Sequence, residues 1–321
     1  MFLKCRIVIL ILCGFCDIMY ALISNIYEAI MLINSIIDKQ AIDKGWSGDK
    51  KYSVKTKSGE KYLLRISPLE KQERRKREFT KMREVAAIGI PMAKPIEIGI
   101  CDEGVYTIES FIEGFDAEEY ICKLSSEQQY NFGLDAGRIL AKIHTIPAPP
   151  NITSWETRFN AKIDRKIAMY LNCELQYDNG QLFLDYVREN RNLLTDRPQT
   201  YQHGDYHIGN MMIDKNNVLN VIDFDRDDFG DPWEEFNRIV WCAGVAPAFA
   251  SGMVDGYFDC NVPLEFWKLL SLYICTNTLS SLPWAIPFGE GEIQTMKDQA
   301  NKILKWYKNM TNIIPTWYEK R

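Results

Sequence analysis

The chain of 321 residues is predicted to be an α+β protein with two lobes: a small antiparallel sheet with one inserted helix, then a larger, mainly helical lobe. Between Trp46 and Phe111, short runs of β-forming residues alternate with turn signals, and one long helical pattern interrupts them. Beyond residue 112, apolar residues recur mainly at helical spacing. We therefore place the lobes at residues 26–112 and 113–321, preceded by an extension of residues 1–25.

The extension of residues 1–25 is apolar and its role is open. Lys4 and Arg6 precede the apolar run from Ile7 to Phe15, as in a secretory signal. The run is short for a membrane span and lacks a clear cleavage site, so no stable membrane insertion is expected. A weak anchor, a packed helix, or leader residues before a start at Met19 or Met31 remain as interpretations.

The first lobe is expected to contain five antiparallel strands. Apolar residues from Ile26 to Ile37 at helical spacing predict a helix before them, ending between Gln40 and Gly45. Ser67-Pro68-Leu69-Glu70 has the pattern of a capping box and predicts the start of the inserted helix, which Gly89 and Pro91 end. Strand-like runs occupy residues 46–57, 60–67, 96–101 and 105–111.

The second lobe is expected to be a set of helices around one short hairpin. Ser125 to Gln128 is a capping signal for a helix that ends before Pro147. Further helical patterns cover residues 159–171, 182–194, 233–243, 266–282 and 293–310.

The most informative segment runs from His203 to Phe224. Apolar runs at 211–213 and 218–222 flank Asp214-Lys215-Asn216-Asn217, which suits a tight hairpin turn. Pairing across this turn sets Asn210 opposite Val221 or Ile222, so Asp223 emerges beside Asn210. An amide and a carboxylate oxygen are thereby brought together, as Mg²⁺ prefers when phosphates and waters complete its shell. Asp205 remains free to face a substrate hydroxyl.

The pattern His203-x-Asp205-x-x-x-x-Asn210 followed by Ile222-Asp223-Phe224 resembles the catalytic and metal-binding loops of the aminoglycoside phosphotransferase family, relatives of the protein kinases. The resemblance implies a protein-kinase-like fold, with Asp205 as the catalytic aspartate and Asn210 and Asp223 as magnesium ligands. Gly230-Asp231-Pro232-Trp233 resembles the family's downstream pattern, in which the aspartate supports the loop. A protein kinase is disfavoured, because the gap between Asp223 and Trp233 is too short for an activation segment.

The same resemblance assigns nucleotide contacts to the first lobe, with ATP or GTP as phosphate donor. Gly45, Ser47 and Gly48 lie where a phosphate-covering loop is expected. Arg65 stands where kinase-like enzymes usually place a lysine. Glu78 is the glutamate on the inserted helix best placed to pair with Arg65. The backbone groups of Glu109 and Phe111 are candidates to line the adenine site.

His203 is expected to brace the catalytic loop, and Asp231 and Glu235 are candidate loop or substrate-pocket contacts. The acceptor is expected to be a small molecule with a hydroxyl group. Residues 201–321 hold 16 Asp and Glu against 10 Lys and Arg. This acidic balance favours a cationic acceptor by long-range attraction, although ordinary solvated surface explains it nearly as well.

The charge and cysteine content of the chain exclude some classes of function. A formal net charge of −5 gives no basic excess for binding nucleic acid, and nine scattered cysteines suit reduced thiols in a cytoplasmic protein. The sequence therefore predicts a small-molecule kinase similar to aminoglycoside phosphotransferases. A choline, homoserine or sugar-type kinase of the same fold, or a non-catalytic pseudokinase in which Arg65 has replaced the lysine, remain as alternatives.

Overall fold

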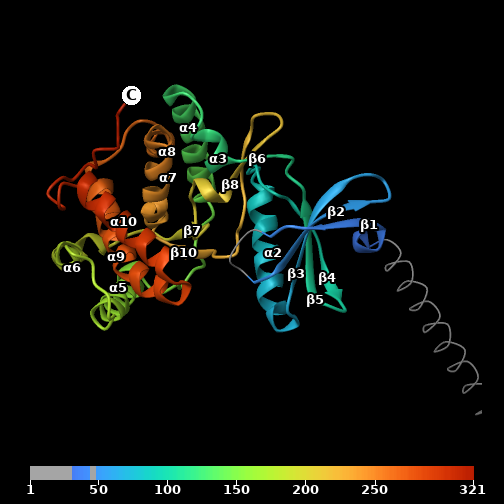
Figure 1. The fold of residues 1–321 in the computed structure, drawn as a ribbon, viewed down its shortest axis with the longest axis horizontal. Helices are drawn as coiled ribbons and strands as arrows, with labels where there is room; N and C mark the ends of the chain where they lie inside the picture. The colour runs from blue at the N-terminus through green and yellow to red at the C-terminus, as the bar shows by residue number, and fades with distance from the viewer. Residues whose placement is uncertain (1–30, 44–47) are drawn as a thin grey trace, which may run out of the picture. The chain divides into compact units, whose positions relative to one another are not determined.

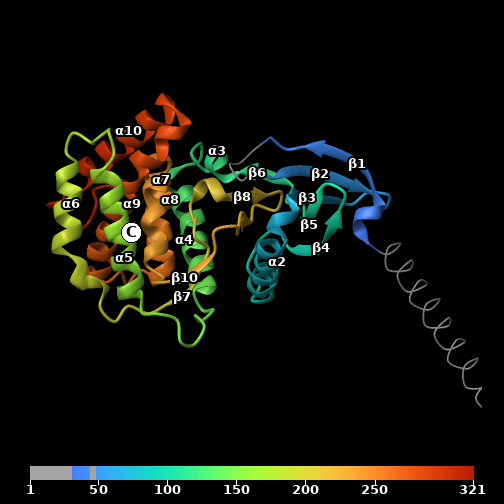
Figure 2. The same ribbon diagram turned by 90° about the horizontal axis from the view of Figure 1, so that it is seen from below.

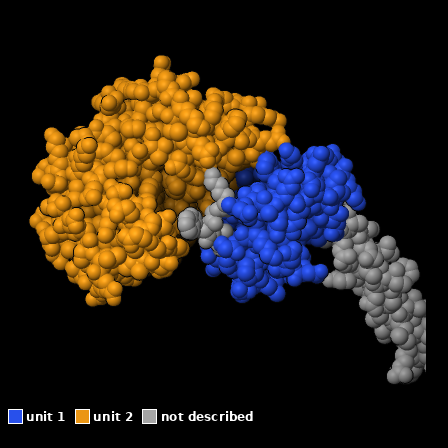
Figure 3. Space-filling model, viewed as in Figure 1, with its two compact units in different colours: residues 1–83, 93–111 blue, residues 84–92, 112–321 orange. Residues whose placement is uncertain are grey.

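The computed structural model describes residues 31–43 and 48–321, which form two compact units (Figure 3). Unit 1 comprises the described residues up to Arg83 together with Ala93–Phe111, and unit 2 comprises Glu84–Met92 and Ile112–Arg321. Unit 1 carries an antiparallel sheet and unit 2 is mainly helical (Figure 1). The predicted α+β class is therefore confirmed.

Unit 1 is built on a five-stranded antiparallel sheet with the strand order β1-β2-β3-β5-β4. Alternate residues of the inner strands, among them Val54, Leu64 and Ile108, are buried in one apolar cluster. Helix α2 lies beside β3 in both views (Figures 1 and 2) and buries Phe79 and Val85. The bounds are β1 (Ile36–Ala41), β2 (Lys50–Thr56), β3 (Lys61–Ser67), α2 (Gln72–Ala87), β4 (Pro95–Cys101) and β5 (Gly104–Ser110).

The helix expected before the sheet is wrong where the structure describes it. Leu32–Ser35 is a single 3₁₀ turn (η1), and Ile36–Ala41 is the edge strand β1, paired with β2. Ile33 and Ile36 pack on the apolar cluster of the sheet, whereas Ile37, which continues the helical spacing after Ile33, is 61% exposed. The β-branched pair Ile36-Ile37 follows its strand preference. The part of the expected helix up to residue 30 lies outside the described residues.

The capping box expected at Ser67 is also wrong. A 3₁₀ turn (η2, Leu69–Lys71) precedes α2, and its N-cap residue is Pro68, which has no capping side chain. Ser67 belongs to β3, and its hydroxyl accepts a hydrogen bond of 2.9 Å from Arg75 Nε instead. The Ser67 hydroxyl therefore binds the side chain of Arg75 and does not cap the turn that follows it. Gly89, at φ +75°, follows the end of α2 as expected.

Unit 2 confirms most of the predicted helices and the Ser125 cap, whose side chain and that of Gln128 form a complete capping box. The patterns at 182–194 and 233–243 each divide into an α-helix and a 3₁₀ turn instead of forming one helix. Helix α8 was missed. It packs against α4 through glycines: a Cβ atom at Gly133 would lie 2.2 Å from the Phe249 carbonyl, and one at Gly137 would lie 2.2 Å from the Met253 carbonyl. The helices are α3 (Ala117–Ile121), α4 (Ser126–Ile143), α5 (Trp155–Leu171), α6 (Gly180–Glu189), η3 (Arg191–Leu194), η4 (Ile208–Asn210), η5 (Glu234–Arg238), α7 (Ile239–Val245), α8 (Pro247–Phe258), α9 (Leu264–Ala285), η6 (Ile286–Phe288) and α10 (Glu290–Trp306).

Two small sheets frame the predicted catalytic segment in unit 2. Strands β6 (Gly114–Asp116), β8 (Met211–Asp214) and β9 (Leu219–Val221) form one, and β7 (Thr200–Gln202) pairs with β10 (Asp228–Gly230) in the other. The loop between β7 and β8 therefore begins in one sheet and ends in the other. Among the helices of residues 31–43 and 48–321, none combines the length and apolar character that crossing a bilayer requires.

Candidate active site

The β8-β9 hairpin has the predicted register. Met211 is paired with Val221, and the Ile222 amide donates a 3.0 Å hydrogen bond to the Asn210 carbonyl. Asp214 holds the turn, since its carboxylate accepts from two backbone amides of the turn, those of Asn216 and Val218. Asp223 follows Ile222 directly, so the hairpin places the backbone of Asp223 next to the partner of Asn210, although thirteen positions separate the two residues.

The backbone at Asp223 adopts the left-handed conformation, with φ +68°. This conformation is uncommon for a residue other than glycine, and it persists where surrounding contacts fix it. Here the bond between Ile222 and Asn210 fixes the residue before it. The strained turn redirects the chain immediately after the hairpin, as is frequent at functional sites.

Asp205 lies among three basic side chains of unit 2. Its carboxylate oxygens are 3.1 Å from Arg238 Nε, 3.3 Å from Arg226 Nη1 and 3.8 Å from His207 Nε2. The side chain of Asp205 keeps 15% of its surface exposed. The carboxylate is therefore charge-paired and still accessible from solvent.

His207 is neutral near pH 7. Burial, with the charge of Arg238, lowers its pKa to about 4, although the Asp205 carboxylate acts in the opposite direction. Nδ1 of His207 accepts a 3.1 Å hydrogen bond from the Gly209 amide. The imidazole proton therefore resides on Nε2, the nitrogen that faces Asp205.

His203 is fully buried and connects the two ends of the catalytic segment. Its Nδ1 accepts from the Asp205 amide at 3.3 Å, so Nε2 carries the proton and donates to the Ile222 carbonyl at 3.0 Å. The ring also packs against Phe224, with 4.5 Å between the ring centroids. These contacts fit the bracing role predicted for His203, and its burial excludes direct contact with an acceptor.

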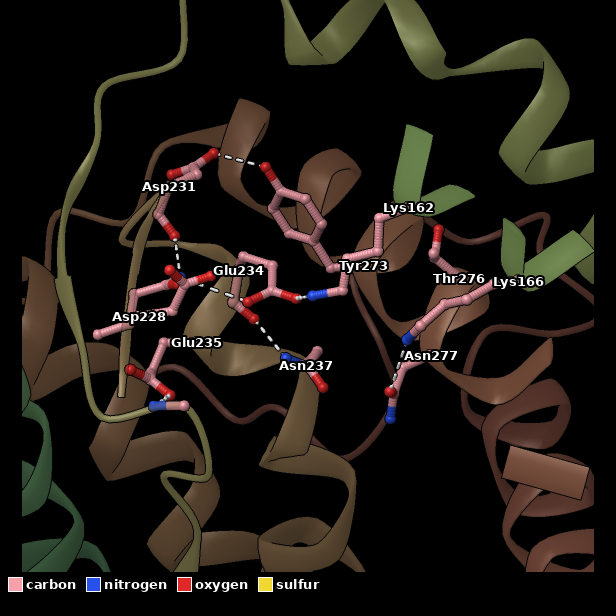
Figure 4. A network of polar contacts seen from close by, with 12 residues as sticks. Lys162, Lys166, Asp228, Asp231, Glu234, Glu235, Asn237, Tyr273, Thr276 and Asn277 are labelled. Atoms are coloured by element: carbon pink, nitrogen blue, oxygen red, sulfur yellow. Dashed lines mark hydrogen bonds and ion pairs between the residues drawn. The ribbon is translucent and has the colours of Figure 1, made fainter. Parts of the chain in front are cut away.

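Asp231 and Glu235 are buried beneath the loop. Asp231 is fully buried, and its carboxylate accepts from Arg197 at 2.6 and 3.0 Å and from the Tyr273 hydroxyl at 2.6 Å. Glu235 accepts a 2.9 Å hydrogen bond from the Gly204 amide (Figure 4). Of the two roles considered for these residues, their burial favours support of the loop over contact with a substrate.

Asn210 and Asp223 suit a hard cation by their chemistry. The amide nitrogen Nδ2 of Asn210 donates to the Asp205 carbonyl at 2.9 Å, which fixes the side chain and leaves its oxygen as the available donor atom for a metal. Across residues 31–43 and 48–321, no cluster of three or more His, Cys, Asp or Glu side chains could hold a metal. A magnesium ion here would therefore depend on nucleotide oxygens and water for most of its shell.

In unit 1, Arg65 is buried beside a carboxylate that sequence reasoning did not single out. Arg65 Nη1 lies 3.8 Å from Asp49, which also pairs with Lys71 at 3.2 Å and with Arg75. Burial alone would raise the pKa of Asp49, but Arg75, the Ser67 hydroxyl and Lys71 lower it. Asp49, which directly precedes β2, is therefore paired with three basic side chains, those of Arg65, Lys71 and Arg75.

The other residues of unit 1 that were predicted to contact the nucleotide lie on α2, on or directly after β5 and in the loop before β2. Glu78 is buried, and its carboxylate is bound by Arg74 and Arg75. Its expected pair with Arg65 stays a prediction. Glu109 is buried in β5, and Phe111 directly follows that strand. Gly48 adopts φ +67° with open space around its Cα, which suits close approach of a phosphate, whereas Gly45 and Ser47 lie outside the described residues.

Sequence reasoning missed the cations that surround Asp205 and Asp231. Arg226 and Arg238 stand 21 and 33 positions after Asp205, and Arg197 reaches Asp231 across 34 positions. Arg226 stands three residues after Asp223, and this short spacing could have indicated it. Nothing in the local pattern marks Arg238 or Arg197, because their partners are set by the packing of η5 and the loop before β7.

The two-lobed fold and the catalytic segment together define a phosphotransferase of the protein-kinase-like class. A family model described as the phosphotransferase enzyme family matches residues 39–267, and this chain belongs to that family. The suspected relationship to aminoglycoside phosphotransferases is thereby confirmed. No curated protein matches the sequence of this chain.

Solved structures of aminoglycoside phosphotransferases share the fold. A thermostable mutant of APH(4)-Ia in its apo form superposes with a TM-score of 0.60 at 18% identity, covering 84% of this chain and 94% of that enzyme. The gentamicin complex of APH(2")-IIa has a TM-score of 0.60 at 17% identity, covering 87% and 95% of the two chains. The GDP complex of aminoglycoside 2'-phosphotransferase-IIIa has a TM-score of 0.62 at 12% identity, covering 86% and 98%. At these identities the likeness shows the fold alone.

Proposed function

We propose that this phosphotransferase is a small-molecule kinase that transfers the γ-phosphate of ATP or GTP to a hydroxyl group of its acceptor. The observation that carries the proposal is the arrangement of the segment from His203 to Phe224. Asp205 has an accessible carboxylate, Asn210 donates a hydrogen bond to the Asp205 carbonyl, and the residue before Asp223, Ile222, is hydrogen-bonded to Asn210. The similar folds that bind ADP or GDP support a nucleotide as donor. A reduced, nucleotide-rich compartment such as the cytoplasm fits this activity.

In this mechanism, Asp205 orients the acceptor hydroxyl and accepts its hydrogen bond. Because phosphoryl transfer passes through a loose transition state, the carboxylate acts mainly by positioning. Arg226 and Arg238 hold the carboxylate oxygens until the hydroxyl arrives. A magnesium ion held by Asn210 and Asp223 would neutralise charge on the phosphates.

The nucleotide would be contacted by unit 1 groups already described. Gly45, Ser47 and Gly48 are proposed to present donors to the phosphates, and Arg65 to supply a positive charge in place of lysine. The backbone of Glu109 and Phe111 is proposed to bind the base. A non-catalytic pseudokinase is the second candidate, favoured by one observation: Arg65 is already beside the Asp49 carboxylate.

Release of ADP or GDP from the full chain over a panel of hydroxylated acceptors tests the proposal. Asp205→Ala is expected to lower the transfer rate about 10³-fold while nucleotide binding persists. Asp164→Asn, which changes an exposed aspartate on α5, is the matched control and is expected to retain the rate. Equal rates in wild type and Asp205→Ala would reject the kinase assignment, and nucleotide binding without any transfer would favour the pseudokinase.

A further inference from the structure

The carboxylate of Glu235 has one oxygen bound to the catalytic loop and one oxygen without a hydrogen bond. Oε1 accepts the 2.9 Å hydrogen bond from the Gly204 amide (Figure 4). Oε2 is buried, and among the described residues it has no hydrogen-bond partner. A buried carboxylate oxygen without a partner is costly, because burial has removed its hydration. A polar group of unit 2 that faces Oε2 would therefore stabilise Glu235 in this position.

The group that faces Oε2 is the imidazole of His144. His144 is the C-cap residue of α4, and its Nε2 lies 3.8 Å from Glu235 Oε2. Only 4% of the His144 side chain and 2% of the Glu235 side chain are exposed. Within residues 31–43 and 48–321, Nε2 also has no hydrogen-bond partner. Two buried polar atoms that each need a partner thus face each other, and an approach of about 1 Å brings them to hydrogen-bond length.

The other ring nitrogen of His144 determines where the proton resides. Nδ1 lies 2.9 Å from the Tyr257 hydroxyl of α8. Burial, with the charges of Asp231 and Glu235, raises the pKa of Tyr257, so this hydroxyl keeps its proton and donates it to Nδ1. When Nδ1 accepts from Tyr257, the proton of the imidazole lies on Nε2, the nitrogen that faces Glu235. This arrangement gives both ring nitrogens a partner.

The backbone of Gly204 is coupled to Asp205, its neighbour in the chain. Gly204 has φ +84°, in the left-handed region that favours glycine, and the Arg226 carbonyl leaves no room for a Cβ atom there. Gly204 is thus packed closely on the backbone of Arg226, whose side chain is paired with Asp205 at 3.3 Å. A change at Glu235 that releases the Gly204 amide therefore moves the catalytic carboxylate.

Building on the kinase assignment above, we propose that His144 is a positioning residue for phosphoryl transfer. The proton on its Nε2 holds Oε2 of Glu235, so that Oε1 stays on the Gly204 amide and Asp205 keeps the position from which it orients the acceptor hydroxyl. His144 itself does not touch the acceptor, because its side chain is buried. The contacts from Tyr257 through His144 to the catalytic loop all lie within unit 2.

Two substitutions separate the roles of the two ring nitrogens. His144→Gln places an amide donor near the position of Nε2, whereas His144→Asn keeps a polar atom near Nδ1 and does not reach Glu235. Because a misplacement of about 1 Å can cost about 100-fold in rate, we expect His144→Asn to lower kcat about 10- to 100-fold with little change in the KM of the nucleotide. His144→Gln is expected to recover most of kcat. Wild-type kcat in His144→Asn, or equal losses in both variants, would overturn the proposal.

The matched control is Tyr130→Phe, which removes a buried hydrogen bond of 2.7 Å to Asp255 between the same two helices, α4 and α8. It is expected to lower stability and to leave kcat unchanged. If His144 acts through Glu235, His144→Asn lowers kcat no further once Glu235 is replaced with alanine, whereas independent effects multiply. Urea unfolding of each variant ensures that folded proteins are compared. Multiplied losses in the double variant, or a loss of kcat in Tyr130→Phe equal to that in His144→Asn, would contradict a positioning role.

Two measurements test the contact without kinase activity. The chain has three histidines, so the imidazole nitrogen-15 signals of His144 are assigned by comparison with His144→Gln. We expect the proton on Nε2, with a resonance that shifts in Glu235→Ala. Hydrogen exchange of the peptide that contains Gly204 is expected to accelerate in His144→Asn and not in Tyr130→Phe. An Nε2 without a proton, or unchanged exchange in His144→Asn, would overturn the proposal.

These readouts also separate the proposal from the kinase assignment. A wild type that shows the expected imidazole signals and exchange but transfers phosphate to no acceptor would count against the kinase assignment alone. Transfer that is lost in Asp205→Ala and unaffected in His144→Asn would count against the role of His144 alone.

Discussion

Replacing Asp231 with asparagine is expected to destabilise unit 2 severely. The substitution preserves shape but removes a buried charge that accepts two hydrogen bonds from Arg197, one from Tyr273 and one from the Trp233 amide. Although burial acts to lower it, the hydrogen bond and charge of Asp231 raise the pKa of Arg197. The guanidinium, with 11% of its side-chain surface exposed, would be left charged without its partner.

The expected cost follows from this loss of a partner. Breaking a buried ion pair by removing one side typically costs about 3–5 kcal/mol, because the remaining charge is not compensated. The Arg197 guanidinium stacks on the Trp233 ring, 3.9 Å from its centroid, and this contact offsets about 1 kcal/mol of the lost stability. We therefore expect Asp231→Asn to lower the free energy of unfolding by about 2–4 kcal/mol.

Urea unfolding followed by tryptophan fluorescence measures this loss, since seven of the eight tryptophans lie in unit 2. The matched control is Asp164→Asn, which breaks the pair of Asp164 with Arg191, where 67% and 29% of the side-chain surfaces are exposed. An exposed pair contributes about 0–1 kcal/mol, so the control should unfold almost as the wild type does. Equal effects of the two substitutions would refute the argument that burial makes the Asp231 pair critical.

Three further predictions concern the catalytic segment. Asp223→Asn should raise the magnesium concentration needed for the half-maximal rate at least about tenfold, measured by metal titration, and an unchanged requirement would remove Asp223 from the metal site. His207 has its pKa lowered to about 4, so the unfolded chain binds the extra proton between about pH 4 and its ordinary value of 6.5. Stability should therefore fall by up to about 3 kcal/mol as the pH drops through this window. His207→Gln should flatten that fall in urea midpoints measured against pH, and an unaltered slope would contradict the assignment. Glu235→Ala should cost about 1–3 kcal/mol by leaving the Gly204 amide without its acceptor, while Glu235→Gln should retain most of the stability. Equal losses in both Glu235 variants would contradict a role through that hydrogen bond.

The sequence predicted correctly those elements whose structure depends on contacts between neighbouring residues. The capping box of Ser125 and Gln128 and the turn held by Asp214 need only neighbouring residues, and both form as expected. The register of the β8-β9 hairpin, which sets Asn210 opposite Ile222, also forms as expected. Periodic apolar stripes likewise revealed most helices of unit 2.

The sequence predictions were wrong for β1 and α8, two elements whose structure depends on packing against distant parts of the chain. Ile33 and Ile37 stand at helical spacing, but residues Ile36–Ala41 pair with β2 and form a strand. Helix α8 has no polar face to produce a stripe, since Phe249 to Asp255 are all buried. Its glycines appear in the sequence as breakers, but they permit backbone contact with α4. Neither outcome could be inferred without knowing the partner element.

In the proposed catalytic site, hydrogen bonds fix the backbone around Asp205, whereas the ion pair of Asp205 with Arg226 is partly exposed. His203 joins the backbone of Asp205 to Ile222, and Glu235 holds the Gly204 amide, so the loop is anchored on both sides of the catalytic position. The partner Arg226, by contrast, has 49% of its side chain exposed, and such pairs are individually weak. In the mechanism proposed above, an acceptor hydroxyl would displace Arg226 at small cost while the backbone of the loop stays in place. Asp205 would then act by aligning the hydroxyl, as catalysis by positioning requires.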